Sequence, residues 1–253
     1  MSLRGHLNEL RKRVLWSGLF FVIASVAGWF LFDPVFETLQ QPVIDLAKQK
    51  GINATINFNS VVSAFDLRMQ LSMFIGLIIS SPFWLYNLWA FITPGLKKNE
   101  RRYSLGFLFA AVPLFLSGCC VAWAMLPAFV KLLLAFTPSG SSNIIGASDY
   151  ILFSIRILLV FGLSFVLPVV LVLLNFVGIL TAKAIRKGWR MAIFLSALIS
   201  AMATPTGDPM SMFLLMAPLL LLYYLAVFVA SLRDRYTARR QTAVEIELAS
   251  AAE

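Results

Sequence analysis

The sequence is poor in charge. Only 13% of its 253 residues are charged, against roughly 25% in an ordinary soluble chain, while 60% are hydrophobic. With a mean hydropathy of +0.84, the chain has too few polar side chains to cover a surface exposed to water. These values exclude an ordinary soluble enzyme and indicate a chain whose solvent is lipid.

Groups for catalysis and metal binding are also scarce. The chain has one histidine, His6, and two cysteines, Cys119 and Cys120, which are adjacent within an apolar run. Adjacent cysteines supply neither a disulfide framework nor spaced metal ligands, so we expect them to serve in packing. The sequence contains no Gly-rich phosphate loop, no paired catalytic carboxylates and no histidine cluster. We therefore predict no enzyme activity, no cofactor and no metal site.

Long apolar runs are what the sequence does contain. A helix is the expected form of each run, because lipid offers the backbone no outside hydrogen-bond partners. We predict an all-α polytopic membrane protein with one domain, residues 1–232, and six spans at about 14–32, 69–92, 104–126, 150–174, 191–203 and 210–232. A kinked, concave bundle is expected, since four spans contain a proline, namely Pro82, Pro113, Pro168 and Pro218.

Four segments depart from a plain span. The run at 191–203 is only about 20 Å long as a helix, short of a roughly 30 Å hydrocarbon core. A short amphipathic helix is expected at 35–47. Residues 130–136 are expected to extend the third apolar block after Pro127 as an outer helix or re-entrant piece. Residues 233–253 are polar and partly acidic, and we predict a mobile cytoplasmic tail there.

The basic residues fall in alternate loops. Of the 21 Lys and Arg residues, sixteen lie before span one, in the second and fourth loops, or after span six. Basic loops stay on the cytoplasmic side, so both termini are predicted to be cytoplasmic and the chain integral to the inner membrane. The net charge of +9 is thereby explained by orientation, and no nucleic-acid partner is expected.

Two carboxylates stand among these cytoplasmic cations, Glu9 and Glu100. A carboxylate matches a guanidinium through two parallel charge-assisted hydrogen bonds, so two of them at the membrane surface could receive a pair of arginines. The alternative is a local ion pair between Glu9 and Arg13, spaced i,i+4, which contributes about 0.3–0.5 kcal/mol and needs no ligand. Spacing alone favours the local pair.

Three groups of motifs follow one another along the chain. The first is HLNELRKR at 6–13, and the second is WAFITPGL at 89–96 with ERR at 100–102. The third is FGLSF at 161–165 with Pro168, followed by ATP at 203–205, Asp208 and Ser211. In order and spacing they resemble the twin-arginine translocase subunit TatC family, over the whole chain through span six.

The resemblance implies a receptor, not an enzyme. A member of this family would bind the N-terminal Arg-Arg signal peptide of folded proteins and nucleate a Sec-independent translocation complex driven by the protonmotive force. Its implied partners are TatA-type and TatB-type single-span subunits and membrane lipid, in homo- and hetero-oligomers. The alternative is a secondary transporter for a small solute, although the spans have almost no ionisable groups and the halves show no inverted repeat.

The resemblance also implies roles for single positions. Glu9 and Glu100 match the acids that receive the signal arginines, and Arg11 is the basic position of the first motif. Phe91 and Pro94 match the segment that shapes the site beside Glu100. Two outer-loop positions match residues with a structural or assembly role, namely Pro42 and Asp208.

Two positions depart from the family pattern. Val166 stands in mid-span where the family usually has Glu or Gln, so a polar or titratable role does not transfer to it. Met212 stands where many relatives have a Gln that contacts a partner helix. We therefore expect more apolar partner contacts at span six.

Overall fold

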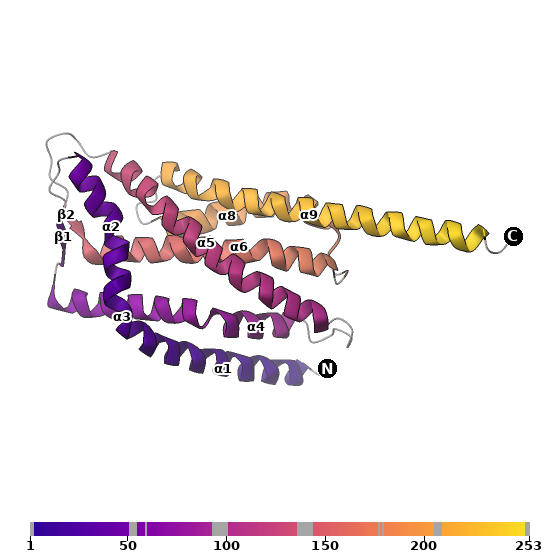
Figure 1. The fold of residues 1–253 in the computed structure, drawn as a ribbon, viewed down its shortest axis with the longest axis horizontal. Coiled ribbons are helices and arrows are strands. Elements are labelled where there is room, and N and C mark those ends of the chain that lie inside the picture. The colour runs from indigo at the N-terminus through magenta and orange to yellow at the C-terminus, as the bar shows by residue number, and fades with distance from the viewer. Residues whose placement is uncertain are drawn as a thin grey trace.

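The computed structural model describes residues 3–50, 55–58, 60–92, 101–135, 144–176, 178, 180–204 and 209–250. Within these ranges the chain is almost entirely helical (Figure 1). Its elements are α1 (Leu3–Phe30), α2 (Phe32–Lys50), β1 (Thr55–Asn57), α3 (Val61–Ile79), α4 (Ser81–Ile92), α5 (Arg101–Ala135), β2 (Ile144–Gly146), α6 (Ala147–Phe176), α7 (Ala182–Lys187), α8 (Trp189–Ala203) and α9 (Pro209–Ser250).

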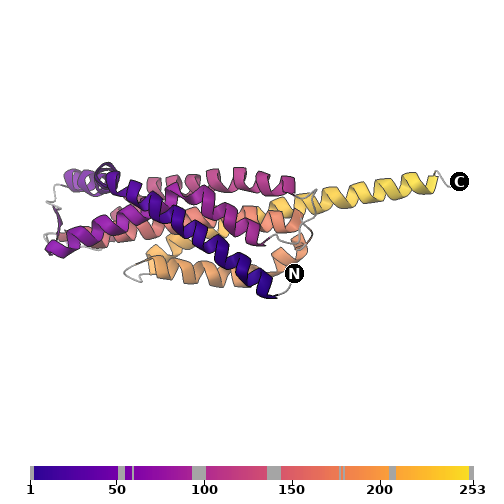
Figure 2. The same cartoon turned by 90° about the horizontal axis from the view of Figure 1, so that it is seen from below.

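The helices form an elongated bundle with two distinct ends. α1 begins, and α9 projects outward, at the same end (Figures 1 and 2). We call this the terminal end; α4 finishes and α5 begins there as well. The opposite end carries α2, which lies across the other helices, together with β1 and β2 (Figure 1), and we call it the α2 end.

The bundle has the character of a membrane protein. Five helices in the described ranges are long and apolar enough to cross a membrane. A sixth apolar helix, α8, has only 15 residues and spans about 22 Å. The all-α membrane class predicted from the apolar runs is therefore confirmed, and the run at 191–203 is indeed short.

The second predicted span is built from two helices. α3 ends and α4 begins on either side of Ser80, whose N–H still donates to the carbonyl of Gly76 at 2.9 Å. Pro82 has no N–H to continue the α3 ladder, which accounts for the break. At this break the carbonyl of Leu77 accepts from the indole Nε1 of Trp84 at 3.0 Å and from Oγ of Ser80 at 3.3 Å.

Residues 130–135 extend the third apolar block as predicted, but they belong to α5 itself, so the predicted outer helix or re-entrant piece is wrong. α5 is continuous through Pro113 and Pro127 and ends at Ala135. Phe129 and Val130 are buried in the largest apolar core, so packing holds this turn in the helix despite the proline.

The tail predicted at 233–253 is helical in the part that the structure describes, and its mobility stays a prediction. α9 continues as one helix from Pro209 to Ser250, so residues 233–250 are helical. Half of its 18 residues are Arg, Ala or Glu, which are good helix formers. The polar composition of residues 233–250 indicates exposure to water, but it did not lead us to predict a helix there.

The α2 end contains structure that the sequence only partly indicated. The amphipathic helix predicted at 35–47 is present within α2, where Leu39 and Val43 are buried against the core. β1 and β2 were not predicted; they pair in parallel, with Thr55 opposite Ile144. Strands of three residues are too short to give an alternating pattern.

Close contacts between small residues hold the main helix pairs together. A Cβ on Gly76 of α3 would lie 2.6 Å from the Cα of Ser25 on α1. A Cβ on Gly118 of α5 would lie 2.7 Å from the carbonyl oxygen of Phe161 on α6. In lipid, such backbone approach replaces the hydrophobic drive of water-soluble cores. Of the two cysteines, Cys119 is buried in the same α5–α6 contact and Cys120 is exposed.

Candidate functional site

The candidate site begins with an ion pair on α1 at the terminal end. Glu9 and Arg13 are one helical turn apart, so their side chains share a face. Arg13 donates from Nε at 3.1 Å and from Nη2 at 2.5 Å, in both cases to Oε1 of Glu9. About a quarter of each side chain is exposed, 27% for Glu9 and 25% for Arg13. The predicted local ion pair is therefore confirmed.

α4 packs beside this pair and fixes its surroundings. Asn87 donates from Nδ2 to Oγ of Ser17 on α1 at 2.9 Å. Farther from the terminal end along the same two helices, the rings of Phe20 and Phe83 stack with centroids 3.7 Å apart and planes 15° apart. A polar contact and an aromatic contact thus join α1 to α4.

Two pockets adjoin the α1–α4 contact. The first, the polar pocket, has a volume of about 350 Å³ and is lined by Glu9, Lys12, Arg13, Trp16 and Asn87. The second, the apolar groove, has about 360 Å³ and is lined by Leu10, Arg13, Val14, Ser17, Gly18, Phe21, Leu77, Trp84, Asn87, Leu88 and Phe91. Since Arg13 and Asn87 line both, a carboxylate pocket and an apolar groove meet at these two residues.

This arrangement suits a ligand with a cationic part and an apolar part. The Glu9 carboxylate can accept charge-assisted hydrogen bonds from a guanidinium. The groove offers an apolar surface between α1, α3 and α4, opened where Leu77 and Trp84 flank the break at Ser80. In the described part of the chain, no three His, Cys, Asp or Glu side chains are grouped as metal ligands would be.

The structure brings together only some of the predicted site residues. Phe91, half-buried at the end of α4, lines the apolar groove beside residues of α1. Arg11 is exposed on α1 and lines neither pocket. Pro42 lies inside α2, at the opposite end of the bundle (Figure 1). The remaining three fall outside the described residues: Pro94, Glu100 and Asp208.

Sequence reasoning missed the α4 side of the site. Asn87 was treated as part of an apolar span, yet it donates a hydrogen bond to Ser17 of α1 and lines both pockets. An amide side chain inside a membrane span indicates a contact with another helix, because polar side chains there usually form hydrogen bonds between helices. Trp16 was likewise read only as apolar, although it lines the polar pocket.

Comparison with known proteins identifies the family. Residues 5–218 match the family model of the Sec-independent protein translocase protein TatC. The chain belongs to the TatC family. Membership makes it a component of protein transport rather than an enzyme, and it replaces the small-solute transporter that the sequence left open.

Individual TatC proteins align along nearly the whole chain. The Sec-independent protein translocase protein TatC of Xylanimonas cellulosilytica is 42% identical over 95% of this chain and 87% of its own length. The TatCy protein of Bacillus subtilis is 34% identical over 99% of this chain and 96% of its own. A crystal structure of the twin-arginine translocase receptor TatC superposes with a TM-score of 0.81 and 30% identity, covering 90% of this chain and 98% of that one.

One of the two departures from the TatC pattern has a clear structural setting. Val166 on α6 is 5% exposed and packs in an apolar cluster with Phe115 and Leu85. An ionised side chain there would require burial without a charged partner in the cluster, so valine suits these surroundings. Met212, on α9, is half-buried.

Proposed function

We propose that the terminal end of this chain is a receptor for the N-terminal signal peptide of folded proteins, which it recognises by two consecutive arginines. Glu9 accepts one guanidinium in the polar pocket, and Glu100 accepts the other. The observation that carries the proposal is the junction at Arg13 and Asn87, where a carboxylate pocket opens beside an apolar groove. A signal that combines arginines with an apolar segment matches both parts.

The Glu9–Arg13 pair is compatible with this role. Both hydrogen bonds from Arg13 end on Oε1, so Oε2 has no side-chain partner among the described residues. An incoming guanidinium can bond Oε2 while Arg13 keeps Oε1. Arg13 and Lys12 repel that cation, so the carboxylate is needed for binding and the site does not hold cations indiscriminately.

The position of Glu100 in the sequence supports its role in the proposed site. It directly precedes Arg101, where α5 begins, and α5 begins at the same end of the bundle as α1 (Figure 1). It also belongs to the motif that resembles the family's second acidic position. The two carboxylates are thereby assigned to one surface, with Phe91 and Pro94 between them in the chain.

The apolar groove binds the apolar segment of the signal. Leu10 and Val14 of α1 form one wall, and Leu88 and Phe91 of α4 form the other. Arginine alone would give poor selectivity on a cationic surface, so the second contact is needed to distinguish a signal from any basic peptide.

The receptor works within a larger assembly. We place the chain in the cytoplasmic membrane with both termini inside, because the described cations Arg11, Lys12 and Arg13 lie at the terminal end. TatA-type and TatB-type single-span subunits are its proposed partners, and the protonmotive force is the proposed energy source. Arg11 contributes to this positive surface rather than to the pocket.

Signal-peptide affinity tests the proposal. The full chain in lipid nanodiscs is titrated with a labelled Arg-Arg signal peptide and with a Lys-Lys version of equal charge. We expect Glu9→Gln and Glu100→Gln each to weaken Arg-Arg binding about tenfold, since a hydrogen bond to a charged group is lost. Glu37→Gln, which removes an exposed carboxylate on α2, is the matched control and should bind as wild type. Wild-type affinity in a folded Glu9→Gln variant would refute the role of Glu9.

A further inference from the structure

A third pocket lies among helices that the proposed signal site does not use. It has a volume of about 310 Å³ and is enclosed by α6, α7, α8 and α9. Its walls are almost wholly apolar, including Leu171, Ile185, Ala192, Leu195 and Leu219. The Tyr223 hydroxyl, which also lines it, donates to the carbonyl of Ile185 and so presents no free polar group. The pocket therefore suits a hydrocarbon ligand.

Four cations lie next in sequence to residues that line this pocket, and we call them the basic cluster: Lys183, Arg186, Lys187 and Arg190. All four are exposed, and each is within two residues in sequence of a pocket-lining residue such as Ala184, Gly188 or Met191. No ion pair involves any of them within the described ranges. Their charge is thus available to a ligand.

A nearby acid, Asp234, offsets at most one of the four positive charges. Asp234 of α9 accepts from Nδ2 of Asn175 at 2.9 Å and from the N–H of Ala182 at 2.8 Å. Both of its oxygens are therefore engaged in holding α6, α7 and α9 together. Between Asp149 and Asp208 the sequence contains no acidic residue. The basic cluster and Asp234 together therefore keep a net positive charge.

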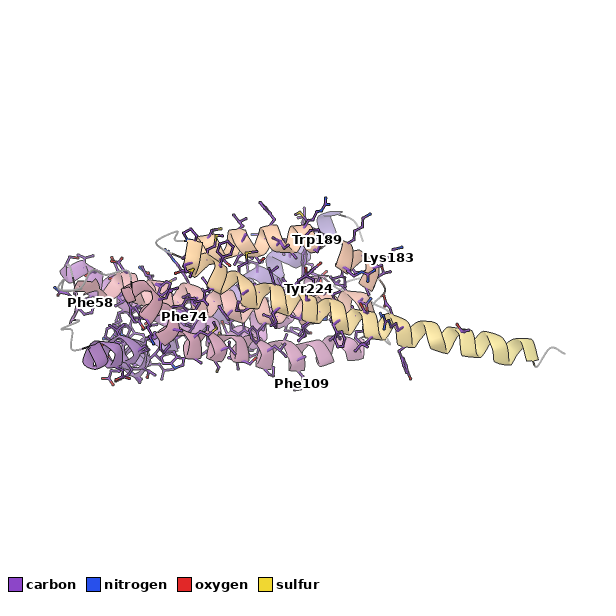
Figure 3. All side chains as sticks on the ribbon, turned by 90° about the horizontal axis from the view of Figure 1, so that it is seen from above. Phe58, Phe74, Phe109, Lys183, Trp189 and Tyr224 are labelled. Atoms are coloured by element: carbon purple, nitrogen blue, oxygen red, sulfur yellow. The ribbon has the colours of Figure 1, made fainter. Side chains whose placement is uncertain are left out.

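The part of the pocket formed by α7 and the start of α8 lies toward the terminal end of the bundle. α8 begins at Trp189, and Figure 3 shows Lys183 and Trp189 toward the end from which α9 projects. Exposed tryptophan and basic side chains are typical of the boundary between hydrocarbon and headgroups. The guanidinium of Arg190 lies 5.6 Å from the ring centre of Trp189, so aromatic and cationic groups are combined at this boundary.

We propose that this pocket is a binding site for an anionic phospholipid, with one acyl chain among α6, α8 and α9 and the phosphate headgroup in the basic cluster. An anionic headgroup matches the four cations of the basic cluster, none of which forms an ion pair in the described ranges, whereas an apolar partner helix in the pocket would leave them without a counter-charge. A zwitterionic lipid would leave the excess positive charge uncompensated.

Lipid titration of the purified full chain, followed by native mass spectrometry, tests this site. Phosphatidylglycerol and phosphatidylcholine with identical chains are the two probes. Wild type should bind phosphatidylglycerol at least about fivefold more tightly, and Arg190→Gln should remove about fivefold of that affinity. Arg235→Gln is the matched control, because Arg235 is exposed on α9 about 18 Å beyond Tyr223 along the helix, and it should change nothing. Ala192→Phe, which fills the pocket, should weaken both lipids.

Two outcomes would overturn the proposal. Equal affinity of the wild type for the two lipids would show that the basic cluster does not bind the headgroup. Equal losses of phosphatidylglycerol affinity in Arg190→Gln and Arg235→Gln would show that only general surface charge attracts the lipid. A photoreactive group in place of Met191, which lines the pocket, provides an independent check in intact membranes. Crosslinking to phospholipid supports the site, whereas crosslinking to a protein instead would assign the pocket to a partner chain.

Discussion

At the scale of single residues, the important feature is that Glu9 has a partner already. The Glu9–Arg13 pair is what i,i+4 spacing predicts, and the structure contains it. That pair does not exclude a receptor role, because both bonds from Arg13 use the same carboxylate oxygen. Arg13 also lines both pockets, so it is placed to compete with an incoming arginine as well as to orient Glu9.

This competition gives a prediction for Arg13→Gln. Removing the cation frees Glu9 and lowers repulsion, so we expect the Arg-Arg signal to bind about two- to fivefold more tightly. A partly exposed i,i+4 pair contributes little to folding, so the free energy of unfolding should change by less than about 1 kcal/mol. Peptide titration and unfolding in detergent measure the two effects. Unchanged binding together with a large loss of stability would mean that the pair is only structural.

At the scale of helices, close packing and one break shape the site. The break at Ser80 separates α3 from α4, and Leu77 and Trp84 on its two sides both line the apolar groove. Five other prolines lie within continuous helices: Pro42 in α2, Pro113 and Pro127 in α5, Pro168 in α6 and Pro218 in α9. Proline therefore predicts where a break can occur, but packing determines whether it does.

Glycine packing between α5 and α6 gives a second prediction. Gly118 and Gly106 are both on α5. A Cβ added at Gly118 would contact the backbone of Phe161, whereas a Cβ added at Gly106 would have no atom within 4 Å. Backbone cannot move aside cheaply, so Gly118→Val should destabilise the chain by about 1–3 kcal/mol or prevent folding. Gly106→Val, the matched control, should be stable. Denaturant titration in detergent compares them, and equal stability would contradict the packing account.

At the scale of the whole molecule, the sequence predicts the class well and the site in part. Apolar runs identify the helices because lipid leaves few alternatives, and motif order points to Glu9 and Phe91. The Asn87–Ser17 bond joins residues 70 positions apart, and the pairing of β1 with β2 joins segments that are also far apart in sequence. Such long-range contacts leave no local periodicity, which is why they could not be predicted.

The two proposed sites lie between different helices of the bundle. Glu9 and the apolar groove lie between α1 and α4, whereas the basic cluster and its pocket lie among α6, α7, α8 and α9. The two proposed sites share no lining residue in the described ranges. Signal binding and lipid binding can therefore be altered separately by mutation.

Site-specific crosslinking tests the central claim most directly. A photoreactive group replaces Phe91, in the apolar groove, or Glu100, and a third variant carries it in place of Phe109, which is exposed on α5 outside both pockets. We predict crosslinks from the first two positions to an Arg-Arg signal peptide, few to a Lys-Lys peptide of equal charge, and none from the third. Equal crosslinking of the two peptides, or none from either site in an inserted and folded chain, would contradict the receptor account.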